Sequence, residues 1–339
     1  MNSFSDKISI RKPDDMHLHL RQGEILKICA PETAKWFQRA LIMPNTTPPI
    51  NNMERVINYK KEIEEAAKNF TPLMSFKLYP DMKEEEIIKL SEAGAVAGKL
   101  YPEGSTTNSE DGVKSWKQIN EALCAMSKLG VILTIHGEKP DSFVLDREKD
   151  YLPELFQIIE HYPDLKIVLE HVSSIEGVNA VMNGPATLGA TITIHHLLIT
   201  LDDLLGGGIT PHNFCKPVVK TPKDRKAIQN AALSGNRKFF FGSDSAPHPE
   251  SLKLKNGGNA GIFSAPAAFP LLVSFFEKNG SKELLENFTS RYGAEFYNLP
   301  LNSSSVTLER KENKVPERFS DIIPFMAGAA IEWDISASG

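Results

Sequence analysis

Short apolar runs recur along the chain and alternate with segments whose apolar residues fall on one side of a helix. Several runs, such as Val131–Ile135 and Ile167–Glu170, are almost continuously apolar, as expected of strands covered on both faces. Eight segments are predicted to be strands: Asp15–Leu20, Ala40–Met43, Leu73–Leu78, Ala95–Leu100, Val131–Ile135, Ile167–Glu170, Ala190–Ile194 and Lys238–Gly242.

Helical patterns fill most of the gaps between these runs. One apolar stripe comprises Val56, Tyr59, Ile63, Ala66 and Phe70. A second stripe comprises Trp116, Ile119, Leu123 and Met126 and ends near Gly130. Asp81 followed by Glu84 predicts a capping box for a helix that stops near Gly94. Two further helices are predicted over Tyr151–His161 and Asp224–Leu233.

Strand–helix alternation repeated eight times predicts an α/β fold, a TIM-like (β/α)8 barrel. A doubly wound open sheet shares this alternation, so the pattern favours the barrel only modestly. The chain has 339 residues, whereas a barrel needs roughly 250. We expect one domain over 1–339, with the barrel core at about 13–300 and a C-terminal extension at about 301–339. The surplus residues lie in that extension and in long loops at 139–150, 197–220 and 246–261.

Composition narrows the class of protein. Lys and Arg number 38 against 43 Asp and Glu, and this acidic balance without a basic run argues against nucleic-acid binding. The three cysteines, Cys29, Cys124 and Cys215, are odd in number and far apart, which fits a reducing compartment better than a disulfide framework. Met1–Lys12 lacks the apolar core of a signal peptide, and the most apolar stretch, Ile262–Phe276, is too short to cross a bilayer. We therefore expect a cytoplasmic protein that binds neither membrane nor nucleic acid.

Histidine and aspartate residues collect at the ends of the predicted strands. His17 and His19 are two apart on one strand, so both side chains face the same way. His136, His171 and Asp244 each follow an apolar strand, and in a barrel such strand ends converge on one mouth. A lone histidine at a strand end usually makes only local hydrogen bonds. Five such residues at four strand ends instead predict a site for one or two transition metals, since imidazole and carboxylate are their usual ligands.

The remaining candidates are less decisive. Lys99 ends the fourth strand: protonated it would oppose a metal, carbamylated by CO2 it would bridge two metals, and the residues alone favour an ordinary lysine reaching toward solvent. His161 lies at a predicted helix end and is interpreted as structural. One of His195 and His196 would form a hydrogen bond to a metal ligand without binding the metal itself. His248 would reach a substrate from its loop.

Seven motifs, in order along the chain, carry a resemblance to a known family. They are Asp14–Arg21, Met43–Asn45, Lys99–Pro102, Thr106–Ser109, His136–Glu138, Leu169–His171 and Gly242–His248. Together they resemble the dihydroorotase family, most closely its short bacterial type within the amidohydrolase superfamily. The resemblance runs from residue 13 to about 300, and the segment Val315–Trp333 is also similar to the family.

The resemblance implies a barrel with two zinc ions. One would be held by His17, His19 and Asp244 and the other by His136 and His171, with carbamylated Lys99 and a hydroxide as bridges. Arg21, Asn45 and His248 would bind the substrate carboxylate, Thr106 and Thr107 would lie on a mobile loop, and the backbone near Cys215–Lys216 and Ala260 would contact the pyrimidine ring. Lys216 departs from the apolar residue expected there, although a backbone contact tolerates this. Zn²⁺, Mn²⁺, Co²⁺ and Fe²⁺ share ligand sets, so the native metal stays open.

The implied reaction is reversible closure of N-carbamoyl-L-aspartate to L-dihydroorotate in pyrimidine biosynthesis. Asp244 would move a proton between the attacking hydroxide and the leaving nitrogen, and the family implies a homodimer. The alternatives are another cyclic-amide hydrolase, such as a hydantoinase or allantoinase, and an inactive scaffold. Arg21, Asn45 and the Thr106–Thr107 loop favour a substrate that carries a carboxylate, whereas an inactive relative would be expected to lack ligands that this chain retains.

Overall fold

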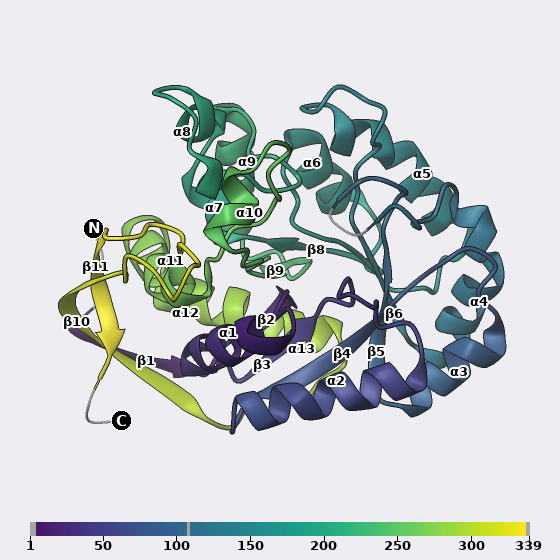
Figure 1. Cartoon of the computed structure of the whole chain (residues 1–339), viewed down its shortest axis with the longest axis horizontal. Coiled ribbons are helices and arrows are strands. Elements are labelled where there is room, and N and C mark those ends of the chain that lie inside the picture. Colours follow the sequence, from purple (N-terminus) through teal and green to yellow (C-terminus); the bar gives the residue numbers. More distant parts are fainter. Residues whose placement is uncertain (1–4, 107–108, 337–339) are drawn as a thin grey trace.

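The chain forms a parallel eight-stranded barrel, seen in a computed structural model that describes residues 5–106 and 109–336 (Figure 1). The barrel strands are β2 Asp14–Leu18, β3 Arg39–Ile42, β4 Thr71–Lys77, β5 Ala95–Leu100, β6 Ile132–Ile135, β7 Ile167–Leu169, β8 Leu188–Ile192 and β9 Phe239–Phe241. Each pairs in parallel with the next along the chain. The ring closes just beyond the last strand, where Leu18 bridges Ser245 and the His19 amide donates to the Ser245 carbonyl at 3.0 Å. This closure confirms the predicted barrel and excludes the open sheet.

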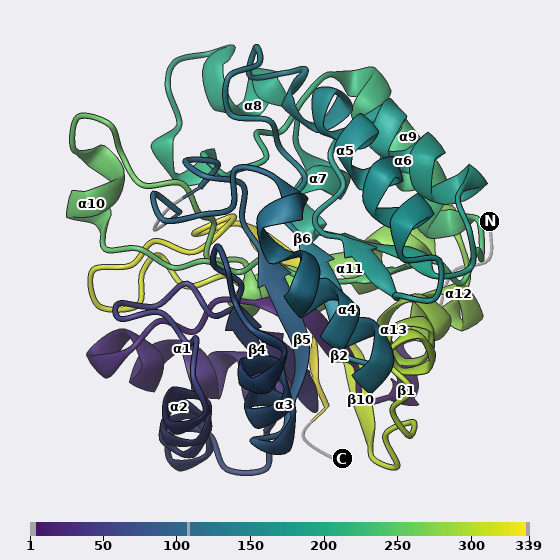
Figure 2. The same ribbon diagram turned by 90° about the vertical axis from the view of Figure 1, so that its right-hand side faces the viewer.

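Helices surround the barrel, as the two views at right angles show (Figure 2). They are α1 Gly23–Trp36, α2 Met53–Ala66, α3 Glu84–Glu92, α4 Asn120–Leu129, α5 Arg147–His161, α6 Ile175–Asn183, α7 Ile194–Leu198, α8 Leu201–Leu205, α9 Pro222–Leu233, α10 Glu250–Leu254, α11 Ala265–Asn279, α12 Lys282–Glu286 and α13 Tyr292–Phe296. Short 3₁₀ turns span Trp116–Ile119 and Pro211–Asn213, and a π turn spans Asn287–Arg291. No helix among the described residues is long and apolar enough to cross a membrane.

The predicted elements are found with small shifts at their ends. All eight strands form, although β2 stops at Leu18, two residues early, because the chain then turns to place His19 at the mouth. The predicted cap at Asp81 is wrong: Asp81 lies in a turn at φ +63°, and α3 begins only after Lys83, whose amide donates to Glu86 at 2.8 Å. The helix does stop before Gly94, which adopts φ +87°.

A second, three-stranded antiparallel sheet lies beside the barrel and was not expected. It orders β1 Lys7–Arg11, β10 Ser305–Lys314 and β11 Ala330–Ile335, so the C-terminal extension pairs with the start of the chain. Figure 1 shows this sheet at one side of the barrel, next to α11 and α12. Ile8, Leu308 and Trp333 of this sheet belong to the main hydrophobic core, whereas Ile331 packs in a small separate cluster.

Two apolar layers hold the barrel together. Outward-facing strand residues such as Ile42 and Leu133 pack under the helices in the main core. Alternate residues face the lumen and form a separate cluster that includes Leu41, Ala97 and Phe240. The lumen is thus a packed core rather than a pore, with the buried Arg39–Asp14 ion pair at the amino ends of β2 and β3 and the histidines at the carboxyl ends.

Candidate metal centre and substrate pocket

The predicted ligands meet at the carboxyl ends of the strands, in one buried cluster. His17 lies on β2, while His19, His136, His171 and Asp244 lie just past the ends of their strands. His171 and Asp244 adopt φ values of +43° and +45°, a region that costs free energy for residues other than glycine. The fold therefore holds these two side chains in positions that the relaxed backbone would not favour.

The first half of the cluster combines His17, His19 and Asp244. The Nε2 atoms of the two histidines are 3.2 Å apart. Asp244 Oδ1 lies 3.3 Å from the His17 Nε2 and 3.2 Å from the His19 Nε2, so three potential ligand atoms face one small space. The Asp244 amide donates to the His17 carbonyl at 2.9 Å, which fixes this carboxylate against β2.

The second half combines His136 and His171. His136 Nδ1 lies 3.2 Å from His171 Nε2, and both rings are buried. The His171 amide donates to Thr191 Oγ1 on β8 at 2.7 Å, which holds the residue in its strained conformation. The rings of His17 and His171 are 5.0 Å apart, so the two halves adjoin.

Lys99 and Glu170 lie at the centre of the arrangement, and neither side chain is exposed. Lys99 Nζ contacts Glu170 Oε2. Glu170 Oε1 is 3.0 Å from His17 Nδ1. Burial lowers the pKa of Lys99 well below its ordinary value, so its amine is readily found uncharged here. The expectation of an ordinary lysine reaching toward solvent is therefore wrong, because Lys99 ends inside the barrel.

Oxygen acceptors form hydrogen bonds with two of the four histidines on the side away from the cluster. His19 Nδ1 lies 2.8 Å from Asn45 Oδ1, and His136 Nε2 lies 2.9 Å from Glu138 Oε2. Each of these contacts uses the N–H of the ring and turns the lone pair of its other nitrogen inward. His17 Nδ1 lies 3.0 Å from Glu170 Oε1 without the geometry of a hydrogen bond. The orienting role of Glu138 was missed from the sequence, although its spacing two residues after His136 was a usable signal.

These contacts test whether the residues fit a metal. With the N–H of His19 donated to Asn45, its Nε2 lone pair faces the His17 Nε2 at 3.2 Å. With the N–H of His136 donated to Glu138, its Nδ1 lone pair faces the His171 Nε2 at 3.2 Å, and His171 Nδ1 has no hydrogen-bond partner among the described residues. Burial lowers the pKa of all four histidines, which keeps them in the neutral form that binds metals. Lone pairs that converge on a buried space suit divalent cations.

This cluster and most of the predicted substrate residues line one pocket with an empty volume of ≈ 360 Å³, whereas His248 packs against Arg21 outside its lining. Arg21, held at φ +60°, donates through Nε to the Pro247 carbonyl at 3.1 Å. His248 Nε2 lies 3.0 Å from the Ala260 carbonyl, and Asn259 Nδ2 donates to His248 Nδ1 at 3.2 Å. Burial lowers the pKa of His248 to about 2, so the ring is neutral. Because Nδ1 accepts from Asn259, the proton lies on Nε2, which donates to the Ala260 carbonyl. The Arg21 Nη2 group, 2.9 Å away, is then left to bind another acceptor.

Three other predicted residues belong to the pocket wall. Asn45, Thr106 and Lys216 all line it, and Asn45 at the same time orients His19. Thr106 lines the pocket wall, and its backbone amide donates to Ser109 Oγ at 2.9 Å. The geometry assigns it no further role. Thr107 lies outside the described residues.

The remaining histidines fall outside this cluster. His161, at the end of α5, packs against Trp116 with ring centroids 5.0 Å apart and the rings tilted by 51°, which agrees with its structural interpretation. His195 and His196 form a separate buried group with Cys215. The His195 ring has no hydrogen-bond partner among the described residues and the His196 ring bonds Thr193 and Pro217, so no hydrogen bond connects either ring to the proposed ligands.

Known proteins match this chain over almost its whole length. The amidohydrolase family matches residues 14–311. A dihydroorotase from Shewanella frigidimarina is 41% identical over 98% of this chain and 99% of its own. The crystal structure of a dihydroorotase from Campylobacter jejuni matches with a TM-score of 0.91 and 40% identity, covering 99% of both chains. The dihydroorotase of Saccharomyces cerevisiae in complex with 5-fluoroorotic acid matches with a TM-score of 0.92 and 36% identity, covering 97% of this chain and 98% of that one.

Proposed function

The chain belongs to the amidohydrolase family, and from that premise we propose that it acts as a dihydroorotase, a metal-dependent cyclic amidohydrolase. Its substrates are N-carbamoyl-L-aspartate and L-dihydroorotate, which it interconverts in pyrimidine biosynthesis. The observation that carries this proposal is the juxtaposition of inward-facing histidine lone pairs with Arg21, a fixed cation at the pocket wall.

Two divalent metals, Zn²⁺ by preference, would be held by this cluster. His17, His19 and Asp244 would hold one, and His136 and His171 the other. When bound, the metals would supply a Lewis acid for the ring carbonyl and depress the pKa of a water molecule. The ring nitrogens that approach each other to 3.2 Å in both pairs support this assignment, because a cation between them would accept both lone pairs.

Lys99 would supply the anionic bridge between the metals as a carbamate. Carbamate formation joins the lysine nitrogen to the carbon of CO2 and releases one proton, so it requires an uncharged amine. The burial that lowers the Lys99 pKa favours that amine. Four neutral histidines and one aspartate leave two dications short of negative charge, which a carbamate would offset.

Asp244 would move the proton of the reaction. In ring opening it would accept the proton of the attacking oxygen and deliver it to the leaving nitrogen, and in ring closure it would act in reverse. Its place between His17 and His19, with the carboxylate turned to the pocket, supports this role.

Arg21 would bind the carboxylate that the reaction leaves unchanged. Its free Nη2 group and its backbone, fixed by Tyr59 Oη at the Arg21 carbonyl, present the guanidinium to the pocket. Asn45 and His248 would complete this subsite, and the backbone at Lys216 and Ala260 would contact the ring. Thr106 and Thr107 would close over the substrate from their loop. We further propose, from the family resemblance, a cytoplasmic homodimer without a nucleic-acid or membrane partner.

Substrate choice tests the proposal against the hydantoinase and allantoinase alternatives. Arg21→Met should lower turnover of L-dihydroorotate far more than that of hydantoin, because a truncated charge-assisted pair costs roughly 2–5 kcal/mol in a desolvated site. Equal losses on both substrates would make Arg21 structural and would remove the argument for a carboxylate substrate.

Metal content tests the bridge. Lys99→Ala should lose metal and activity together, and a small carboxylic acid added to the variant should restore part of both. Lys77, which pairs in register with Lys99 on the neighbouring strand, provides the control, since Lys77→Met should keep the metals. Full metal content in Lys99→Ala would rule out the carbamate bridge. It would not contradict the proposed reaction as long as the wild-type protein interconverts the two substrates.

A further inference from the structure

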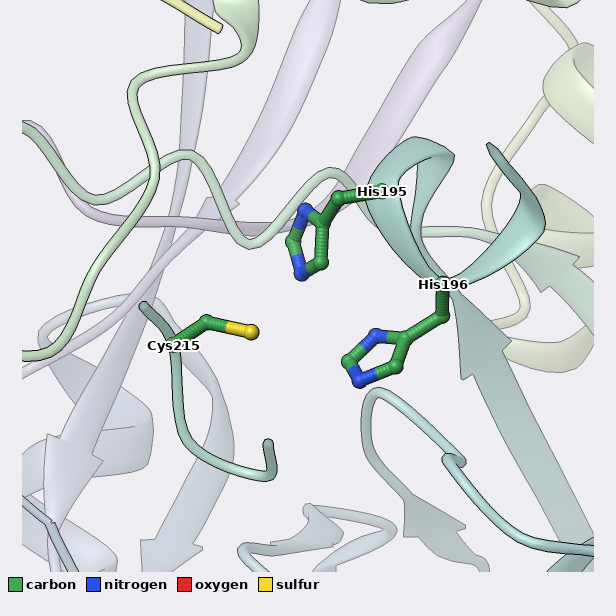
Figure 3. A group of neighbouring side chains, drawn as sticks. All are labelled: His195, His196 and Cys215. Atoms are coloured by element: carbon green, nitrogen blue, oxygen red, sulfur yellow. The ribbon is translucent and has the colours of Figure 1, made fainter. Parts of the chain in front are cut away.

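A second group of metal-ligand residues lies buried outside the catalytic cluster. His195 and His196 come from α7, and Cys215 comes from the segment after the turn Pro211–Asn213. One ligand atom from each lies within 4.8 Å of the other two. Figure 3 shows the three side chains pointing toward one another. The group shares no residue with the proposed catalytic metal centre.

His195 is the residue that points to a ligand. Its exposed fraction is 0%, yet neither ring nitrogen has a hydrogen-bond partner among the residues that the structure describes. A buried polar group without a partner costs on the order of 1–3 kcal/mol, so folds rarely leave one without a reason. Its ring lies beside that of His196, with centroids 4.7 Å apart. Burial lowers the pKa of His195 to about 4, which keeps the ring neutral.

His196 and Cys215 turn toward the same space. His196 Nε2 lies 3.2 Å from the Pro217 carbonyl oxygen, to which its N–H can donate, while Nδ1 lies 2.8 Å from Thr193 Oγ1. Metal binding at Nε2 would use the other tautomer, in which the Nδ1–H is donated to Thr193 Oγ1. The Cys215 thiol donates to the same Pro217 oxygen at 3.2 Å. Two imidazoles, a thiol and a carbonyl oxygen therefore lie around one small buried space.

We propose that His195, His196 and Cys215 form a further metal site for a cation of the Zn²⁺ class, with the Pro217 carbonyl oxygen beside it. Sulfur with imidazole is a ligand set of Zn²⁺ and its relatives rather than of Mg²⁺ or Ca²⁺. Binding breaks the Cys215 S–H bond, forms a metal–sulfur bond and releases one proton, with no change of oxidation state. Burial raises the pKa of Cys215 to about 12, so this proton leaves only when the cation takes its place.

The site would stiffen one wall of the catalytic pocket. Its ligands connect α7 to the segment Cys215–Pro217, and Lys216 in the middle of that segment lines the pocket. A cation here would hold that segment in one position without touching the substrate. The inference does not rest on the proposed reaction, because it concerns metal binding alone.

Cobalt distinguishes this site from the catalytic one. The proposed catalytic ligands are nitrogen and oxygen atoms, whereas this site adds a thiolate. Full-length protein loaded with Co²⁺ should therefore show a thiolate-to-cobalt charge-transfer band in the near ultraviolet and bind one more Co²⁺ per chain than Cys215→Ser. The band should disappear in Cys215→Ser and persist in Cys124→Ser, in which an exposed cysteine is changed.

His195→Gln provides a second test, since it keeps the thiol and removes one nitrogen. It should weaken the Co²⁺ affinity at the thiolate band at least tenfold while the catalytic metals stay bound. Fully loaded wild type without a thiolate band would overturn the proposal. A band that survives Cys215→Ser, or an unchanged affinity in His195→Gln, would do the same.

Discussion

The apolar middle of the barrel lumen and its carboxyl end are built from the same strands and differ in their inward-facing residues. On β5, Ala97 faces the lumen core and Lys99, two residues later, faces the mouth. On β6, Ile132 packs in the same core and His136 follows at the mouth. The alternation of the strand is unchanged between the two positions. One scaffold therefore provides a packed floor and a polar mouth by changing side chains alone.

The difference separates stability from chemistry. The floor contains apolar contacts such as Phe240 against Phe296, with ring centroids 5.4 Å apart. The mouth contains buried ionisable groups, ring nitrogens opposed at 3.2 Å and three residues at positive φ, Arg21, His171 and Asp244, and each of these costs free energy. We conclude that the floor stabilises the fold and that the mouth is maintained for its reaction.

The largest difference between the effect on activity and the effect on stability is expected at Asp244. Asp244→Asn keeps an oxygen ligand but cannot accept a proton at neutral pH, so kcat should fall ~10²–10⁴-fold. Thermal unfolding should stay close to that of the wild type, since the side chain keeps its size. Steady-state kinetics beside a melting curve measure both. A kcat within a few-fold of wild type would remove Asp244 from the proton transfer.

The opposite result, a large loss of stability with unchanged metal binding, is expected at Phe240. Phe240→Ala should destabilise the protein by ~3–5 kcal/mol, because a buried aromatic side chain leaves a cavity. Metal content per folded chain should be unchanged, because no ligand lies in the floor cluster. Denaturant unfolding and metal analysis test this together. Loss of metal at constant folded fraction would show that floor and mouth are not independent.

A fall in pH should lower the free energy of unfolding through the histidines of the mouth, whereas the apolar floor cluster should contribute equally at every pH. The pKa of His19 is lowered by burial to about 4 from an ordinary 6.5, so between these values the unfolded chain binds a proton that the folded chain does not. The stability of metal-free protein should therefore fall as the pH drops from about 6.5 to 4, by on the order of 3 kcal/mol for this residue. His19→Gln should flatten that slope. Phe240→Ala should shift the whole curve downward without changing its shape, and a changed slope in that variant would contradict the separation.

The smallest effect is expected at Glu138, which contacts a proposed metal ligand and does not itself bind the metal. Glu138 orients His136 at 2.9 Å, and loss of such a partner typically costs ~10–100-fold in metal affinity or activity. Glu138→Gln should weaken the metal by about this factor while keeping the fold. Titration with a competing chelator measures it. Unchanged affinity would mean that His136 is oriented by the backbone alone.

The sequence predicts those parts of the molecule that depend on local pattern. Period-two alternation and apolar runs located eight strands, and strand ends located His17, His136 and Asp244, because both follow from geometry within a few residues. The β1–β10–β11 sheet was missed, since it pairs segments almost 300 residues apart. Asp81 failed as a cap because its turn, at φ +63°, delays the helix by two residues. His195 and Cys215 meet only through the path of a loop, which no local pattern specifies.

The most direct measurement incubates metal-loaded protein with L-dihydroorotate or with N-carbamoyl-L-aspartate at several pH values, with hydantoin and allantoin in parallel. Ring closure removes one negative charge and consumes one proton. Both starting compounds should therefore reach the same final ratio, and the ratio of dihydroorotate to carbamoyl aspartate should fall ~tenfold per unit rise in pH. Hydantoin and allantoin should turn over far more slowly. If protein with two metals per chain interconverts neither compound, or prefers hydantoin, the proposed function is wrong.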